Sequence, residues 1–287
     1  MSTAVFAVVA GSMTLPAADA GILFADSFRY ANGNLSGNAG GSGWTGAWAG
    51  GAGASGNLVS APLVANPGDA TARSIQISKN VSATTRSLST TYASGANSYY
   101  VSFVFNASPY SSPGQNAYAG VSLYLSSDRP PVSTTSGNGL FLGMPGSSGQ
   151  LGFDWQNRGD ALLAAASATN YLVLVAITPG TTASNTWVKL FATTDLTMTG
   201  SALAATTAVG AIDDASFSFD SVEIAGNYNS GTINFAGLAM ADNANDAVTF
   251  TQNAVPGPGA MLVLALAARF GAAPGSARRR ASTIAGE

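Results

Sequence analysis

The stretch Tyr99-Tyr100-Val101-Ser102-Phe103-Val104-Phe105 decides the fold class. Its odd-numbered positions carry Tyr, Val, Phe and Phe, so one face is apolar at a period of two residues. That period is typical of a β-strand, because successive side chains of a strand point to opposite faces. Val121-Ser122-Leu123-Tyr124-Leu125 alternates in the same way. Such runs recur between clusters of Gly, Ser, Asn and Pro, which predicts an all-β protein with an antiparallel β-sandwich fold.

The expected strands are short and cover the whole body of the chain. Phe219 and Val222 both suit the inward face although they are three positions apart, which predicts a bulge or a strand break between them. The Ala-rich stretch 161–168 is the one expected helix. The expected strands are 22–28, 58–64, 73–78, 99–106, 118–126, 139–144, 150–155, 171–178, 186–193, 216–225, 232–241 and 247–251.

The 287 residues divide into three parts, of which the first is a signal peptide over 1–20. An apolar run over 3–13 is followed by Pro16 and by Ala18-Asp19-Ala20. Small residues at positions −3 and −1 are what signal peptidase accepts, so we expect cleavage after Ala20. The alternative is that the apolar run is a buried first strand. Residues 21–252 then form one β-sandwich domain, a size that such domains often reach undivided.

The C-terminal part, 253–287, combines a hinge, an apolar segment and a basic cluster. The hinge contains Val255, Pro256 and Pro258 and cannot join a sheet. The apolar segment 261–268 can enter a bilayer, and the cluster Arg278-Arg279-Arg280 then stays on the cytoplasmic side. The alternative is a Pro/Gly/Arg tail without a role.

This order of features resembles the PEP-CTERM sorting signal of exported bacterial proteins, although Gly257 stands where that signal has Glu. The resemblance implies transient membrane insertion through the tail and processing by an exosortase-type enzyme. It also implies an exported protein that ends at the cell surface or in the extracellular matrix.

Charge and residue types exclude several classes of function. Only 9% of residues are charged and the formal net charge is −3. The body 21–252 has seven basic and twelve acidic residues, a net charge of −5, so it lacks the basic surface that nucleic acid requires. The chain has no Cys and no His. Disulfides, zinc sites built on thiolate or imidazole, and Ser-His-Asp triads are therefore excluded.

Carboxylate chemistry is also poorly represented. A glycosidase needs two carboxylates roughly 5–9.5 Å apart. Glu223 is the one Glu of the body, and it lies three positions from Asp220, so on a regular strand the two point to opposite faces. We therefore expect a protein that is not an enzyme. The alternatives are a carbohydrate-active enzyme with an unrecognised pair, and a purely structural component of the envelope.

The opening of the body has a distinctive pattern: Asp26-Ser27-Phe28-Arg29-Tyr30, then a Gly-rich stretch with Trp44 and Trp48. It resembles the opening of a family of exported bacterial proteins whose bodies are concanavalin A-like (laminin-G-like) jelly rolls. The resemblance implies a jelly-roll fold and a glycan-binding or adhesion module, with extracellular polysaccharide as the partner. Near the end of the body, 235–240 lacks the acidic residues and the Arg that the family commonly has there.

Trp44 and Trp48 are the candidate ligand-binding residues, because an aromatic face suits the apolar face of a sugar ring. A role in pinning the Gly-rich loop explains them equally well. Trp155 and Trp187 lie in expected strands and are predicted to be core residues.

A calcium site is the one cofactor hypothesis, with Asp242, Asn243, Asn245 and Asp246 as candidate ligands. Carboxylate and amide oxygens are the ligands that Ca²⁺ prefers. Ala244 occupies a ligand position of the EF-hand spacing, so the cluster is not an EF-hand. The alternative, which we favour, is that these residues form a turn by bonding to their own backbone.

Overall fold

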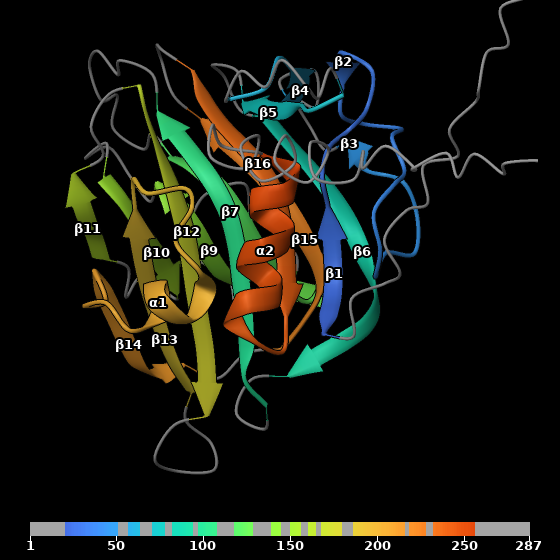
Figure 1. The fold of residues 1–287 in the computed structure, drawn as a ribbon. Coiled ribbons are helices and arrows are strands. Elements are labelled where there is room, and N and C mark those ends of the chain that lie inside the picture. Colours follow the sequence, from blue (N-terminus) through green and yellow to red (C-terminus); the bar gives the residue numbers. More distant parts are fainter. Residues whose placement is uncertain are drawn as a thin grey trace, which may run out of the picture.

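A computed structural model shows two antiparallel sheets packed face to face (Figure 1). The all-β, antiparallel β-sandwich predicted from the sequence is thereby confirmed. The structure describes residues 21–50, 57–63, 71–77, 82–93, 97–107, 118–128, 139–144, 150–155, 160–164, 168–179, 186–215, 218–227 and 232–255.

The first sheet has nine strands among the described residues, in the order β14-β13-β12-β7-β16-β5-β4-β2, and β1 also pairs with β16. Its strands are β1 (Ile22–Asp26), β2 (Gly33–Asn34), β4 (Asn57–Ser60), β5 (Ser74–Ile77), β7 (Tyr99–Ala107), β12 (Thr169–Pro179), β13 (Thr186–Thr193), β14 (Gly210–Ala215) and β16 (Ile233–Ala241).

The second sheet has seven strands among the described residues, in the order β11-β10-β9-β8-β15-β6-β3. Its strands are β3 (Ala49–Gly50), β6 (Ser82–Ala93), β8 (Tyr118–Tyr124), β9 (Leu140–Met144), β10 (Gln150–Trp155), β11 (Asp160–Ala164) and β15 (Ser218–Asn227). A short 3-10 helix, η2 (Ser126–Asp128), follows β8.

The main core lies between the sheets, and the alternating strands face it as predicted. Tyr99, Val101, Phe103 and Phe105 of β7 all belong to it, with exposed fractions of 0–6%. Phe103 packs on Phe235 of the neighbouring β16, with ring centroids 5.5 Å apart. Burial of such side chains contributes roughly 1.5–3 kcal/mol each, which makes this layer the main source of stability.

Two helices cover the outer face of the nine-stranded sheet (Figure 1). The short α1 (Gly200–Ala204) lies beside α2 (Ala244–Ala254), which packs across β7 and β16. The buried residues of α2 have a spacing of i, i+3, i+4, i+7 and i+10, which defines one face of a helix: they are Ala244, Ala247, Val248, Thr251 and Ala254. Within the described part of the chain, no helix has the length and apolarity needed to span a membrane.

Most expected strands are present, and two assignments are wrong. The strand predicted over 247–251 is part of helix α2. The helix predicted over 161–168 is wrong because 161–164 belong to strand β11, which pairs with β10. The predicted break in β15 is confirmed, since its register against β6 shifts between Phe219 and Ser221.

Candidate functional site

The opening motif is organised by one buried carboxylate, that of Asp26, which is 1% exposed. Its Oδ2 accepts hydrogen bonds from the Tyr30 hydroxyl at 2.6 Å and from Trp48 Nε1 at 2.9 Å. Its Oδ1 accepts from the backbone N–H of Phe28 at 2.8 Å, which holds Phe28 at a φ of +54°. Three residues of the Gly-rich loop and its entrance are thus tied to the end of β1.

Arg86 of β6 supplies the positive charge of this cluster. One of its NH groups lies 2.9 Å from Asp26 Oδ2 and also donates to the Gly40 carbonyl, while Nε donates to the Gly46 carbonyl at 2.6 Å. Burial raises the pKa of Asp26, and the hydrogen bonds from Tyr30 and Trp48 and the charge of Arg86 oppose that rise. Burial and the Asp26 charge raise the pKa of Tyr30. The ion pair therefore joins the loop to both sheets.

Trp44 and Trp48 belong to the same cluster. Their ring centroids are 5.5 Å apart, and the Arg86 guanidinium lies 4.8 Å from the Trp44 centroid and 5.8 Å from that of Trp48. Trp44 is half-buried and donates from Nε1 to the Ala25 carbonyl at 2.9 Å, while Trp48 is 1% exposed. A ring that is 1% exposed has no face for a sugar. The geometry matches the loop-pinning alternative for Trp48, and Trp44 keeps a partly open surface.

The residues proposed for calcium form the start of helix α2. Asn243 is its N-cap: Oδ1 accepts from the Asp246 N–H at 2.9 Å. The Asn243 amide donates to Asp242 Oδ1 at 3.0 Å and to Asp246 Oδ2 at 2.7 Å, and Asn245 Oδ1 accepts from the Ser201 N–H at 2.8 Å. These are the bonds expected of capping residues. In the part of the chain that the structure describes, no three acidic side chains come together as a metal site.

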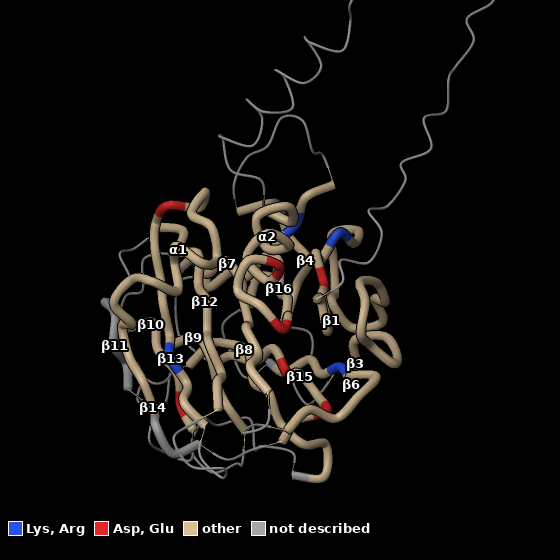
Figure 2. Tube along the Cα trace, turned by 60° about the horizontal axis from the view of Figure 1, so that its bottom comes forward, with Lys and Arg blue, Asp and Glu red and all other residues tan. Residues whose placement is uncertain are grey.

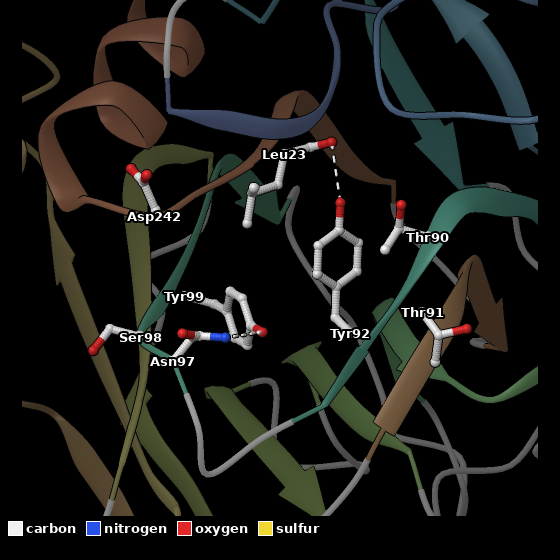
Figure 3. A pocket seen from close by; sticks show the side chains of 8 residues that line it. All are labelled: Leu23, Thr90, Thr91, Tyr92, Asn97, Ser98, Tyr99 and Asp242. Carbon is white, nitrogen blue, oxygen red and sulfur yellow. Dashed lines mark hydrogen bonds between the residues drawn. The ribbon is translucent and has the colours of Figure 1, made fainter.

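A pocket of about 500 Å³ opens at one end of the sandwich, where the two sheets meet (Figure 3). Its volume falls within the range typical of small-ligand sites. The residues that line it come from β1, β6, the start of β7 and the end of β16, and are Leu23, Thr90, Thr91, Tyr92, Asn97, Ser98, Tyr99 and Asp242.

The floor of this pocket is aromatic and its rim is polar. Tyr92 stacks on Phe219 with centroids 5.4 Å apart and meets Tyr99 edge-on at 5.7 Å. Asn97 donates a long 3.4 Å hydrogen bond to the Tyr99 hydroxyl, and Tyr92 donates one of the same length to the Leu23 carbonyl. Burial, and then the neighbouring Tyr99, raise the pKa of Tyr92, so its hydroxyl stays protonated at neutral pH. The pocket therefore presents neutral donors and acceptors beside two rings.

Asp242 is the one carboxylate among the residues that line the pocket. Charged residues elsewhere are few, and the largest groups on one strand are the pair Asp213 and Asp214 of β14 and the pair Asp220 and Glu223 of β15 (Figure 2). The register places Glu223, Ser122, Phe141 and Asp154 in one row on the outer face of the seven-stranded sheet. Three strand spacings separate the backbones of Glu223 and Asp154, roughly 14 Å.

The other predicted residues fall in three places. Trp155 is 5% exposed, as predicted for the core. Trp187 is not a core residue: it is half-buried, points to the outer face of β13, and lies 4.8 Å below the Lys189 ammonium. Val255 follows the last turn of α2 and is 4% exposed, so packed structure continues past the expected boundary at Gln252. Ala18, Ala20, Pro256, Pro258, Arg278, Arg279 and Arg280 lie outside the described residues.

The pocket was not predicted from the sequence. Of its residues only Asp242 belonged to a candidate site, as a calcium ligand. Six of its lining residues lie within 90–99, at the end of β6 and the start of β7, and only the fold brings Leu23 and Asp242 beside them.

These features define the class of the protein as an antiparallel β-sandwich with a polar, tyrosine-lined pocket at one end of the sheets. No family model and no curated protein matches the sequence. Among solved structures, the globular domain of T. cruzi calreticulin is similar at 12% identity, covering 75% of this chain and 89% of that chain with a TM-score of 0.45.

The exoplasmic/lumenal domain of VIP36, in its form with Ca²⁺ and Man2 bound, is similar at 10% identity. That match covers 73% of this chain and 86% of the VIP36 chain, with a TM-score of 0.37. These values are too low for an argument about binding or activity.

Proposed function

We propose that this protein is an exported, non-catalytic β-sandwich that binds a polysaccharide chain in the pocket between β1, β6 and β7. The observation that carries the proposal is the lining of the pocket. It combines the rings of Tyr92 and Tyr99 with the hydroxyls of Thr90, Thr91 and Ser98 and one amide, on Asn97. A sugar has an apolar ring face and a rim of hydroxyl groups, so it matches this combination of aromatic surface and neutral hydrogen-bonding groups.

Binding without catalysis follows from the chemistry of the same residues. The chain has no His or Cys, and the lining of the pocket includes a single carboxylate, that of Asp242. One carboxylate cannot act as both the acid and the base or nucleophile of glycoside hydrolysis. The protein therefore holds its ligand rather than cleaving it.

Export is supported by the sequence at both ends. The apolar run before Ala18-Asp19-Ala20 has the order of a signal peptide, and the tail has the order of a sorting signal. An exported glycan-binding protein meets polysaccharide at the cell surface or in the matrix. The experiment below measures whether binding of the polysaccharide requires calcium.

The test is an array of polysaccharide fragments read with and without calcium, followed by titration of the strongest ligand. The double variant Thr90→Ala/Asn97→Ala removes two hydrogen-bonding groups from the rim (Figure 3). At about 1 kcal/mol for each hydrogen bond, affinity should fall roughly 30-fold. Thr85→Ala is the matched control, because it removes a threonine from the same strand outside the pocket.

The melting temperature of each variant is measured beside its affinity, so that a loss of folding is not read as a loss of binding. A wild-type protein that binds no fragment would contradict the proposal and favour a purely structural envelope component. Release of reducing sugar by the purified protein would contradict the non-catalytic part.

A further inference from the structure

Gly21, the residue before β1, sits against two carboxylates. Gly21 is buried, and its carbonyl accepts a hydrogen bond from the Asp242 N–H at 3.0 Å. A Cβ atom added to Gly21 would collide with Asp246 Oδ2, and would lie 2.8 Å from Asp242 Oδ1 and 3.1 Å from Asn243 Nδ2. The Cα atom of Gly21 therefore lies directly beside both carboxylate groups.

Within the part of the chain that the structure describes, the two carboxylates lack a counter-charge. Asp242 Oδ1 and Asp246 Oδ2 share one neutral donor, the Asn243 amide, at 3.0 and 2.7 Å. Among the described residues, no Lys or Arg makes an ion pair with either of them. Two like charges that share one neutral amide are stabilised by any cation placed beside them.

The signal-peptide cleavage predicted from the sequence points to a cation at this place. The expected cleavage after Ala20 is at the peptide bond to Gly21, the residue that the fold places on the carboxylates. Hydrolysis of this bond by a signal peptidase consumes one water: Ala20 leaves with the new carboxylate, and Gly21 keeps the nitrogen as an α-ammonium. That nitrogen is bonded to the same Cα atom.

We infer that Gly21 is the N-terminus of the mature protein and that Asp242 and Asp246 bind its α-ammonium group. The inference rests on the export part of the proposed function, and its test does not require sugar binding, although Asp242 also lines the pocket. It also gives the Asp242–Asp246 cluster a ligand, which is the chain's own terminus rather than calcium. The absence of a side chain at position 21 is what allows this close approach.

The charges near Gly21 determine whether the pKa of its α-amine rises or falls. Asp242 follows β16 and Asp246 lies in the first turn of α2, and both favour the charged amine. The N-terminal end of α2 carries about half a positive charge and opposes it, but two carboxylates outweigh half a charge. The hydroxyl of Tyr92 of β6 donates to the Leu23 carbonyl. Because its pKa is raised, it is neutral at the pH at which an α-amine titrates. The α-amino pKa is therefore expected to rise.

Two measurements test the inference. First, mass spectrometry of the exported protein should find a chain that begins at Gly21. Second, an NMR titration of the α-amine in the 21–287 chain should give a pKa roughly half to one unit above its ordinary 7.7–8.0, because Asp242 is exposed and the interaction is screened. Asp242→Asn and Asp246→Asn should each lower that pKa toward the ordinary value. Asp195→Asn, at an exposed aspartate in the loop between β13 and α1, is the matched control and should leave it unchanged.

The outcomes separate this inference from the proposed function. Exported protein that begins at another residue overturns the inference and leaves export standing. An α-amino pKa that is ordinary in the 21–287 chain, or that the two Asn variants do not change, also overturns it. If no protein is exported, both the inference and the export part of the proposed function fail, while sugar binding is judged by its own titration.

Discussion

The ion pair between Arg86 and Asp26 is predicted to be the most sensitive single point of the fold outside the apolar core. The test is Arg86→Met, which keeps the length of the side chain and removes its charge. Asp26 is 1% exposed, so its carboxylate would stay buried without a counter-charge. Removing one partner of a buried ion pair costs about 3–5 kcal/mol, a large part of a total stability of about 5–15 kcal/mol.

The same substitution frees other groups. The carbonyls of Gly40 and Gly46 lose the hydrogen bonds that the Arg86 guanidinium donates. The indoles of Trp44 and Trp48 lose the cation that lies beside them. The loop between β1 and β4 should then open before the sheets do, because these contacts hold it and not the core.

Urea unfolding measures the loss of stability, and thermal unfolding gives a second reading. At about 2–4 °C for each kcal/mol, the melting temperature should fall by roughly 6–20 °C. Arg29→Met is the matched control: Arg29 is exposed and bonds to the Asn253 carbonyl at the surface, so its loss should cost less than about 1 kcal/mol. Asp26→Asn/Arg86→Met removes both charges and should recover part of the loss. A loss in Arg86→Met no larger than that of Arg29→Met would refute the reasoning.

Two further substitutions test the packing. Trp48→Ala should cost about 3–5 kcal/mol in urea unfolding, because the indole is buried and bonds to Asp26, and should leave sugar affinity unchanged; a stable variant with weakened binding would restore Trp48 as a ligand residue. Gly237→Ala should cost at least about 2 kcal/mol, since Gly237 has a φ of +60° and an added Cβ would lie 2.9 Å from the Ala254 Cβ. Gly46→Ala, with nothing near its added Cβ, should change stability by less than about 1 kcal/mol, and equal losses in both glycine variants would contradict this account.

The sandwich was predictable because most of its strands bury one face against a common core. In β7 and β8 the inward positions are apolar and the pattern has a period of two, so the sequence alone identifies them. The long strand β6 was missed for a physical reason. Its inward residues include Thr84, which accepts from the Asn57 amide at 2.9 Å, and Arg86, which bonds to Asp26. Polar residues at inward positions hide the alternation on which the prediction depends.

Helix α2 was missed because composition and spacing disagree. Val248, Thr249 and Thr251 are β-branched and favour strands. The spacing of the buried residues and the N-cap at Asn243 favour a helix. The helical spacing stabilises the chain only because that face packs on β16. At Gly237 the register of β16 against β7 shifts, and Thr251 of α2 donates to the Gly237 carbonyl at 3.0 Å. The helix and the bulge thus depend on each other, and neither is visible in a local window of sequence.

The distinctive opening of the body points away from the place where function is to be sought. Its density of Asp, Arg, Tyr, Gly and Trp is accounted for by one cluster, in which Asp26 and Arg86 tie a Gly-rich loop to both sheets. Asp26 and Trp48 hold this loop, are each 1% exposed and are not free to meet a ligand. The pocket, in contrast, takes six of its eight lining residues from 90–99, where β6 ends and β7 begins, and the other two, Leu23 and Asp242, are distant in the sequence. In this chain the most recognisable sequence pattern therefore reflects the contacts that hold the Gly-rich loop. The pocket forms only when the two sheets pack together.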